Sequence, residues 1–120
     1  MIYTLCYGYF RIFIGFTILM TSNYKFQNQS FCIKNSTPTT LFDIDIFGVH
    51  IDSIPPNTVS SWYDFSYNPN TDDAMIYCNT KGYRYASYVH IPDAEIQKFR
   101  YELESIKNQV LFVKFIAVYE

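Results

Sequence analysis

Tyr83, Arg84 and Tyr85 follow one another in a segment whose side chains predict a β-strand. In an extended strand the two phenol rings lie on one face and the guanidinium group lies on the other. An aromatic ring on such a face can stack on a nucleic-acid base, at roughly 1–3 kcal/mol per base. Tyr77 and Tyr88 can join the same surface across strands. The segment predicts a binding face or, as the simpler interpretation, tyrosines that pack in the core.

Positive charge for a binding face has to come from a few local residues, because the whole chain carries a net charge of −2. Residues 74–119 are mildly basic, which places the bases near the tyrosines in sequence. Twelve Tyr and eleven Phe make the chain rich in aromatic residues, which fits a stacking surface or simply an AT-rich coding sequence. The candidate binding residues are Tyr83, Arg84, Tyr85, Lys81, Lys98 and Arg100.

Catalytic and metal-binding patterns are weak. His50 and Asp52 share a face if the chain is extended there, and Asp43 and Asp45 can add carboxylates to a metal site. No further ligand follows at a diagnostic spacing, so solvated positions on a sheet face explain them equally well. His90 ends a predicted strand and fits a surface histidine better than a general base. We therefore expect no enzyme activity, no catalytic residue, no metal and no cofactor.

The cysteines and the glycosylation pattern bear on the compartment. Cys6, Cys32 and Cys78 have neither CxxC nor Cys/His spacing, which predicts free thiols in a reducing compartment rather than disulfides or zinc. Acceptor patterns for N-glycosylation occur at Asn28 and Asn35. Such three-residue patterns arise often by chance, so they add little to a case for secretion.

Residues 1–20 form a nearly continuous apolar run with Arg11 at its centre. A charge at the bilayer centre costs on the order of 2.5–3.5 kcal/mol on insertion scales, which argues against a spanning helix. Three interpretations stay open. Residues 1–19 are an extension upstream of a true start at Met20, a membrane anchor or signal, or aromatic strands of the core. The first predicts a cytoplasmic protein, and the second a protein anchored in a membrane through residues 1–20.

Alternating side chains predict most of the remaining chain as strands. The turn-forming clusters at 68–73 and 80–82 separate the later ones. Expected strands cover residues 31–33, 41–47 with a continuation at 49–51, 58–67, 74–79 and 83–91. The last three runs predict an antiparallel meander.

After Pro92 the period changes to three and four residues, which predicts a helix over residues 94–108 with Asp93 as its N-cap. Its apolar stripe would consist of Ile96, Phe99, Leu103, Ile106 and Val110. Residues 110–119 predict a final strand, unless the helix continues past Asn108. The expected fold is a single α+β domain over residues 20–120, in which one C-terminal helix packs on the meander.

Residues 63–119 resemble the KTSC domain, a short module of bacterial single-domain proteins and of some lysyl-tRNA synthetase C-termini. The matching residues are Tyr63-Asp64 or Tyr67, Met75-Ile76-Tyr77, Gly82, Tyr83-Arg84-Tyr85, Val89-His90-Ile91-Pro92, residues 112–116 and Tyr119. The chain departs from the family in a longer gap between Tyr85 and Pro92 and in lacking a glycine after the expected helix. The resemblance implies a helix after the central strand and suggests RNA binding.

Two functional hypotheses follow from these patterns. The first is a small non-enzymatic module that binds RNA or a protein through the sheet face of Tyr83 and Tyr85. It is assisted by the bases Lys81, Arg84, Lys98 and Arg100. The second is an accessory protein of a phage or mobile element that binds and inhibits a host protein. A membrane partner is expected only if residues 1–19 belong to the mature chain.

Overall fold

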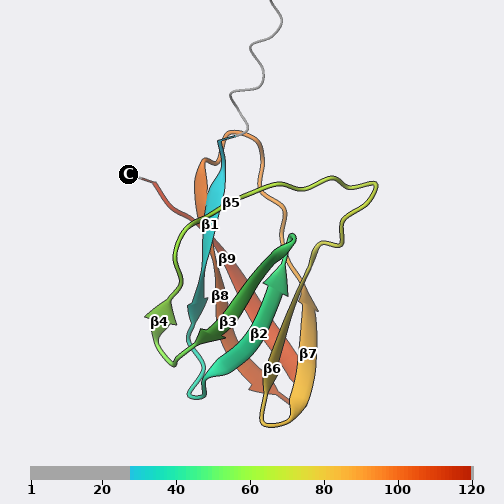
Figure 1. Ribbon diagram of the computed structural model, residues 1–120. Coiled ribbons are helices and arrows are strands. Elements are labelled where there is room, and N and C mark those ends of the chain that lie inside the picture. Colours follow the sequence, from blue (N-terminus) through green and yellow to red (C-terminus); the bar gives the residue numbers. More distant parts are fainter. Residues whose placement is uncertain (1–27, 120) are drawn as a thin grey trace, which may run out of the picture.

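The computed structural model describes residues 28–119, and this part of the chain consists of two packed β-sheets (Figure 1). The first sheet has the order β4-β1-β8-β9, and β5 also pairs with β1. Its strands are β1 (Ser30–Asn35), β4 (Thr58–Val59), β5 (Tyr63–Asp64), β8 (Lys98–Lys107) and β9 (Val110–Ala117). The second sheet has the order β3-β2-β6-β7, with β2 (Leu41–Ile46), β3 (Val49–Ile54), β6 (Met75–Thr80) and β7 (Tyr83–Tyr88).

The predicted α+β class is wrong, because the described residues contain no helix and residues 98–107 form strand β8. The sequence there satisfies two periods at once. Phe99, Tyr101 and Leu103 are buried and alternate with partly exposed Lys98 and Arg100, which is the two-residue rhythm of a strand. β1 pairs with β8 in parallel and β9 pairs with it on the other side. The segment forms a strand because β1 and β9 provide hydrogen-bonding neighbours on both of its sides. The sequence of the segment alone does not show that these neighbours exist.

The predicted antiparallel meander is also only partly right. β6 and β7 form the expected hairpin, but the segment at 58–67 contributes only the short strands β4 and β5. Both pair with β1 and so belong to the first sheet. β2 is the true neighbour of β6. The final strand, β9, forms as predicted and pairs with β8.

Three tight turns share one backbone geometry. The turns after β2, β6 and β8 consist of Phe47-Gly48, Lys81-Gly82 and Asn108-Gln109, and all six residues have positive φ angles between 48° and 81°. Two successive positive φ angles are the mark of the type I′ turn, whose twist matches that of paired antiparallel strands. The glycines at 48 and 82 take this conformation without steric cost. These turns therefore fix the register of three hairpins.

The connections gather at two ends of the sandwich, which we call the lower and the upper end after the view in Figure 1. The lower end comprises the turns at residues 36–40, 55–57, 81–82 and 108–109. The upper end comprises the turn at 47–48 and the longer connections at 65–74 and 89–97. The two sheets enclose the core between these ends.

The core is dominated by aromatic rings in its upper half. Phe31 is fully buried, and its ring centroid lies 5.7 Å from that of Phe47 and 6.0 Å from that of Phe99. Further members of this aromatic cluster are Tyr63, Phe65, Tyr67, Tyr101 and Phe115. Ring pairs at such separations contribute about 0.5–1.5 kcal/mol beyond their buried area. Much of the unusual aromatic content therefore builds the core.

Cys32 and Cys78 are free and buried, as predicted. Burial raises the pKa of the Cys78 thiol to about 11, so this group stays protonated and unreactive near neutral pH. Asn35 is fully buried, which excludes it as a glycosylation acceptor in the folded chain. The interpretations of residues 1–20 and of Cys6 lie outside the described residues. Within residues 28–119, no helix is long and apolar enough to cross a membrane.

Candidate functional site

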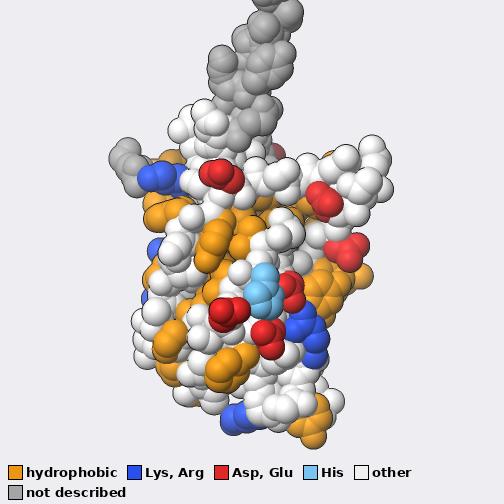
Figure 2. All heavy atoms as spheres, viewed as in Figure 1, with side chains coloured by type: hydrophobic (Ala, Val, Ile, Leu, Met, Phe, Trp, Pro, Cys, Tyr) orange, Lys and Arg blue, Asp and Glu red, His pale blue; other side chains and the backbone are white. Residues whose placement is uncertain are grey.

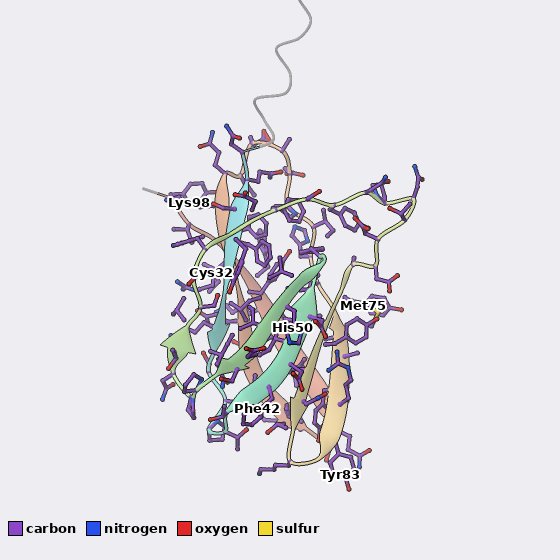
Figure 3. All side chains as sticks on the ribbon, viewed as in Figure 1. Cys32, Phe42, His50, Met75, Tyr83 and Lys98 are labelled. Carbon is purple, nitrogen blue, oxygen red and sulfur yellow. The ribbon has the colours of Figure 1, made fainter. Side chains whose placement is uncertain are left out.

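A cleft at the lower end brings two of the predicted binding residues together. Lys81 and Tyr85 both line it, and the volume of the cleft is about 260 Å³. Its other walls come from the turn after β1, from β6 and from the β8–β9 hairpin, and consist of Thr37, Pro38, Thr39, Thr80, Ile106 and Gln109. Tyr83 stands at the lower tip of the β6–β7 hairpin, where 67% of its surface is exposed (Figure 3).

A buried hydrogen-bond network holds the turn that forms one wall of the cleft. The Asn35 amide donates to the carbonyl oxygens of Thr39 and Ile54, each at 2.8 Å. Its Oδ1 accepts from the Thr37 backbone N–H at 2.9 Å and from the Thr37 hydroxyl at 2.6 Å. Asn35 lies in the first sheet and Ile54 in the second, so one side chain joins both sheets to the turn. All four bonding capacities of this amide are used, which fixes its orientation.

The same network extends to the β6–β7 hairpin on the opposite wall. The hydroxyl oxygens of Thr39 and Thr80 lie 3.2 Å apart, and Thr80 also donates to the Thr40 carbonyl at 3.3 Å. Thr80 directly precedes the turn that carries Lys81. The backbone on both sides of the cleft is thus held in one arrangement before any partner arrives.

Arg84 points away from this cleft, on the outer face of the second sheet. Its Nη2 lies 2.7 Å from Asp45 Oδ2, and its Nη1 donates to Asn79 Oδ1 at 2.8 Å. The guanidinium carbon is 5.4 Å from the centre of the Tyr77 ring. Tyr85, by contrast, packs against the core. The tyrosines at 83 and 85 therefore lie on one side of β7 and Arg84 on the other, as the alternation along the strand predicted.

His50 occupies the centre of the same outer face, surrounded by carboxylates (Figure 2). His50 Nδ1 lies 2.7 Å from Asp45 Oδ1, and its Nε2 lies 3.3 Å from Asp52 and 3.6 Å from Asp43. The hydrogen bond to Asp45 is the main cause that raises the pKa of His50, and the same bond lowers the pKa of Asp45. No group of ligands among the described residues is arranged to hold a metal ion. The arrangement is a surface charge network that joins β2, β3 and β7.

Lys98 and Arg100 lie on the outer face of the first sheet, because they alternate in β8 with the buried Phe99. Arg100 pairs with Glu102 at 2.9 Å. The Lys98 ammonium lies 5.3 Å from the centre of the Trp62 ring. The structure thus brings Lys81, Tyr83 and Tyr85 to one end of the molecule and separates them from Arg84, Lys98 and Arg100, which lie on two opposite faces.

The turn at residues 36–40 is the part of the site that sequence reasoning missed. Its Ser, Thr and Pro residues indicate a polar loop, and nothing local distinguishes a buried Thr37 from a solvated one. The partners that bury it come from positions such as Ile54 and Thr80, far along the chain. Only the packing of the two sheets makes the network visible.

Comparison with known proteins gives no further guide to this site, since no family model, no curated protein and no solved structure matches the chain. The resemblance to the KTSC domain stays a prediction. The function therefore has to be inferred from the geometry of the chain itself.

Proposed function

We propose that this chain is a small non-enzymatic module that binds a protein partner at its lower end. The observation that carries the proposal is the cleft beside the exposed Tyr83, with walls fixed by the Asn35 hydrogen-bond network. A site that is rigid before binding loses little conformational entropy when the partner arrives. Loops held on a rigid β-scaffold are a common place for binding residues. Tyrosine is also among the residue types enriched at protein interfaces.

The lining of the cleft supports binding rather than catalysis. It contains neither a histidine nor a carboxylate nor a cysteine, which are the side chains that most often act as general base or activated nucleophile. Its volume, about 260 Å³, is below the range of roughly 300–1,000 Å³ usual for small-molecule sites. One protruding side chain of a partner is the occupant that such a space fits best.

Nucleic acid is the second candidate, since Lys81 and Tyr83 flank Gly82 at an exposed turn. Affinity for nucleic acid rests mainly on several bases that contact phosphates together. Arg84 and Arg100 each pair with a carboxylate and face opposite sides of the sandwich. This dispersal of positive charge supports a protein partner over RNA.

Photo-crosslinking tests the proposal with a matched pair of tyrosines on one strand. Tyr83 and Tyr88 are both strongly exposed, at 67% and 80%, but only Tyr83 stands at the lower end. Benzoylphenylalanine replaces each of them in the full chain, expressed in its native cells. We expect one protein to be crosslinked at position 83 and not at position 88.

Two results would contradict this proposal. Equal capture of the same protein from both positions would show that the lower end is not the binding site. Crosslinks from position 83 to RNA alone, weakened by salt, would favour the second candidate. A stability measurement on both variants shows beforehand that each is folded.

A further inference from the structure

The charges at the two ends of the sandwich differ in sign. The lower-end turns at 36–40, 55–57, 81–82 and 108–109 contain no carboxylate; their one ionic side chain is Lys81, and Lys107 ends the neighbouring strand. The upper-end connections contain Asp72, Asp73, Asp93 and Glu95, and none of their residues is Lys or Arg. Opposite charge attracts a partner before contact and sets its orientation. The lower end therefore favours an acidic partner.

Lys81 is the base that a partner meets inside the cleft. It is exposed, and no ion pair joins it to any described residue, whereas Arg84 and Arg100 each have a carboxylate partner. Its backbone is fixed by the tight turn with Gly82 and by the Thr80 hydrogen bonds next to it. The Lys81 ammonium group is thus available to bind a partner, and the backbone that carries its side chain is held in place.

The remaining walls of the cleft suit the stem of an acidic side chain. Pro38, Ile106 and Tyr85 supply apolar surface, and Gln109 adds a side-chain amide to the same lining as Lys81. Methylene groups gain from contact with the apolar walls, while a carboxylate accepts hydrogen bonds from an ammonium or an amide N–H. An apolar stem that ends in a negative charge matches both parts of the lining.

We propose that the cleft accepts an acidic side chain, Glu or Asp, from an extended segment of the protein partner, with its carboxylate on Lys81. This inference rests on the proposed function and adds to it the chemistry of the residue that is recognised. It excludes a basic or purely apolar anchor residue at this position.

Selection from a library of random peptides displayed on phage tests the inference with the full chain as the target. We expect the enriched peptides to share an acidic residue at one position. Replacing that residue by its amide should weaken binding at least tenfold, because Lys81 then loses its charge partner. Lys81→Gln should cause the same loss, and the two changes together should cost no more than either alone.

Two control pairs separate the possible failures. Lys107→Gln removes a charge at the same end but outside the cleft lining, and should leave the peptide affinity within about twofold. Pro38→Trp narrows the cleft and should abolish binding, while Pro69→Trp at the upper end should not.

Failure of the acidic specificity and failure of the proposed function give different results. Peptides that lose binding in Pro38→Trp but not in Lys81→Gln would overturn the acidic specificity and leave the cleft as the binding site. Peptides that bind Pro38→Trp as well as the unchanged chain, or a library without any enriched peptide, would overturn the proposed function as well.

Discussion

The two ends of this sandwich are held together by different kinds of interaction. The upper half packs aromatic rings around Phe31, whose contacts are numerous and depend little on direction. The lower end depends on Asn35 and Thr37, whose few hydrogen bonds require fixed distances and angles. Apolar packing tolerates small shifts, whereas a buried amide with every bond made has one arrangement. The lower end, although built from turns, is therefore suited to hold a preformed cleft.

The largest expected effect comes from removing the centre of the aromatic cluster. Phe31→Ala deletes a fully buried ring and should lower the free energy of unfolding by about 3–5 kcal/mol, as measured by urea denaturation. Phe42→Ala is the matched control, because 49% of Phe42 is exposed, and it should cost far less. Similar losses at both positions would show that the upper core is not packed as described.

The next effect concerns the polar end. Asn35→Ala removes the donor to the buried Ile54 carbonyl oxygen and the acceptor of the buried Thr37 N–H. It should cost about 2–4 kcal/mol, since each buried unsatisfied group costs roughly 1–3 kcal/mol. The rate of hydrogen exchange at the Thr37 amide should increase in the same variant. Asn70→Ala, at an exposed asparagine of the upper end, should leave stability nearly unchanged. An unchanged exchange rate at Thr37 in Asn35→Ala would show that the hydrogen bonds of Asn35 do not hold the turn at the lower end.

A smaller effect tests a partly buried hydrogen bond that ties the connection at residues 89–97 to the core. The Tyr101 hydroxyl donates to the His90 carbonyl. Tyr101→Phe keeps the ring and should cost about 1 kcal/mol, near the usual net value of one hydrogen bond. If the loss equals that of Asn35→Ala, the contrast between the two ends disappears. Urea denaturation of both variants in one buffer decides this.

The smallest effect is a pH dependence that belongs to neither end but to the outer face between them. The pKa of His50 is raised from 6.5, so its stabilising contribution is full below pH 6.5 and disappears as the pH rises through the folded-state value. The pKa of Asp45 is lowered from 3.8, so its contribution is lost as the pH falls through the folded-state value. Both contributions are full between pH 3.8 and 6.5.

Thermal unfolding of His50→Gln and of the unchanged chain measures this pH-dependent contribution to stability. The gap between their melting temperatures should be wider at pH 5.5 than at pH 8.5, and should shrink in high salt because the groups are exposed. His90→Gln is the matched control, since no ion pair joins His90 to any described residue, and its gap should not change in this way. A gap that widens toward pH 8.5 would contradict the assigned sign.

The sequence predicted the strands better than their partners. The strands predicted at 41–47, 74–79 and 83–91 correspond to β2, β6 and β7 of the second sheet, and the turn predicted at 80–82 contains the tight turn Lys81-Gly82. β8 was mistaken for a helix, because Phe99, Leu103 and Ile106 satisfy the helical spacing while Tyr101 adds the strand spacing. Which spacing prevails depends on β1, about 68 residues earlier, which no local pattern reveals.

The candidate site was predictable only in part. Lys81 and Tyr85 were identified from their residue types and do line the cleft. Arg84 lies on the opposite face of β7 from Tyr83 and Tyr85, as the alternation along a strand predicted. The alternation could not show that Asp45 and Asn79 would bind its guanidinium there. The polar turn around Thr37 carried no signal, since its importance comes from burial by distant segments.

The parallel pairing of β1 with β8 has a consequence for how the protein is made. β1 is synthesised about 68 residues before β8, the strand beside which it lies. Until β8 appears, the edge of β1 that pairs with it stays open and Phe31 lacks its contact with Phe99. Open strand edges and exposed apolar side chains are the features through which nascent chains associate wrongly. Because β1 and β8 are distant in the chain, we expect slow folding of the first sheet that starts only after β8 has been synthesised.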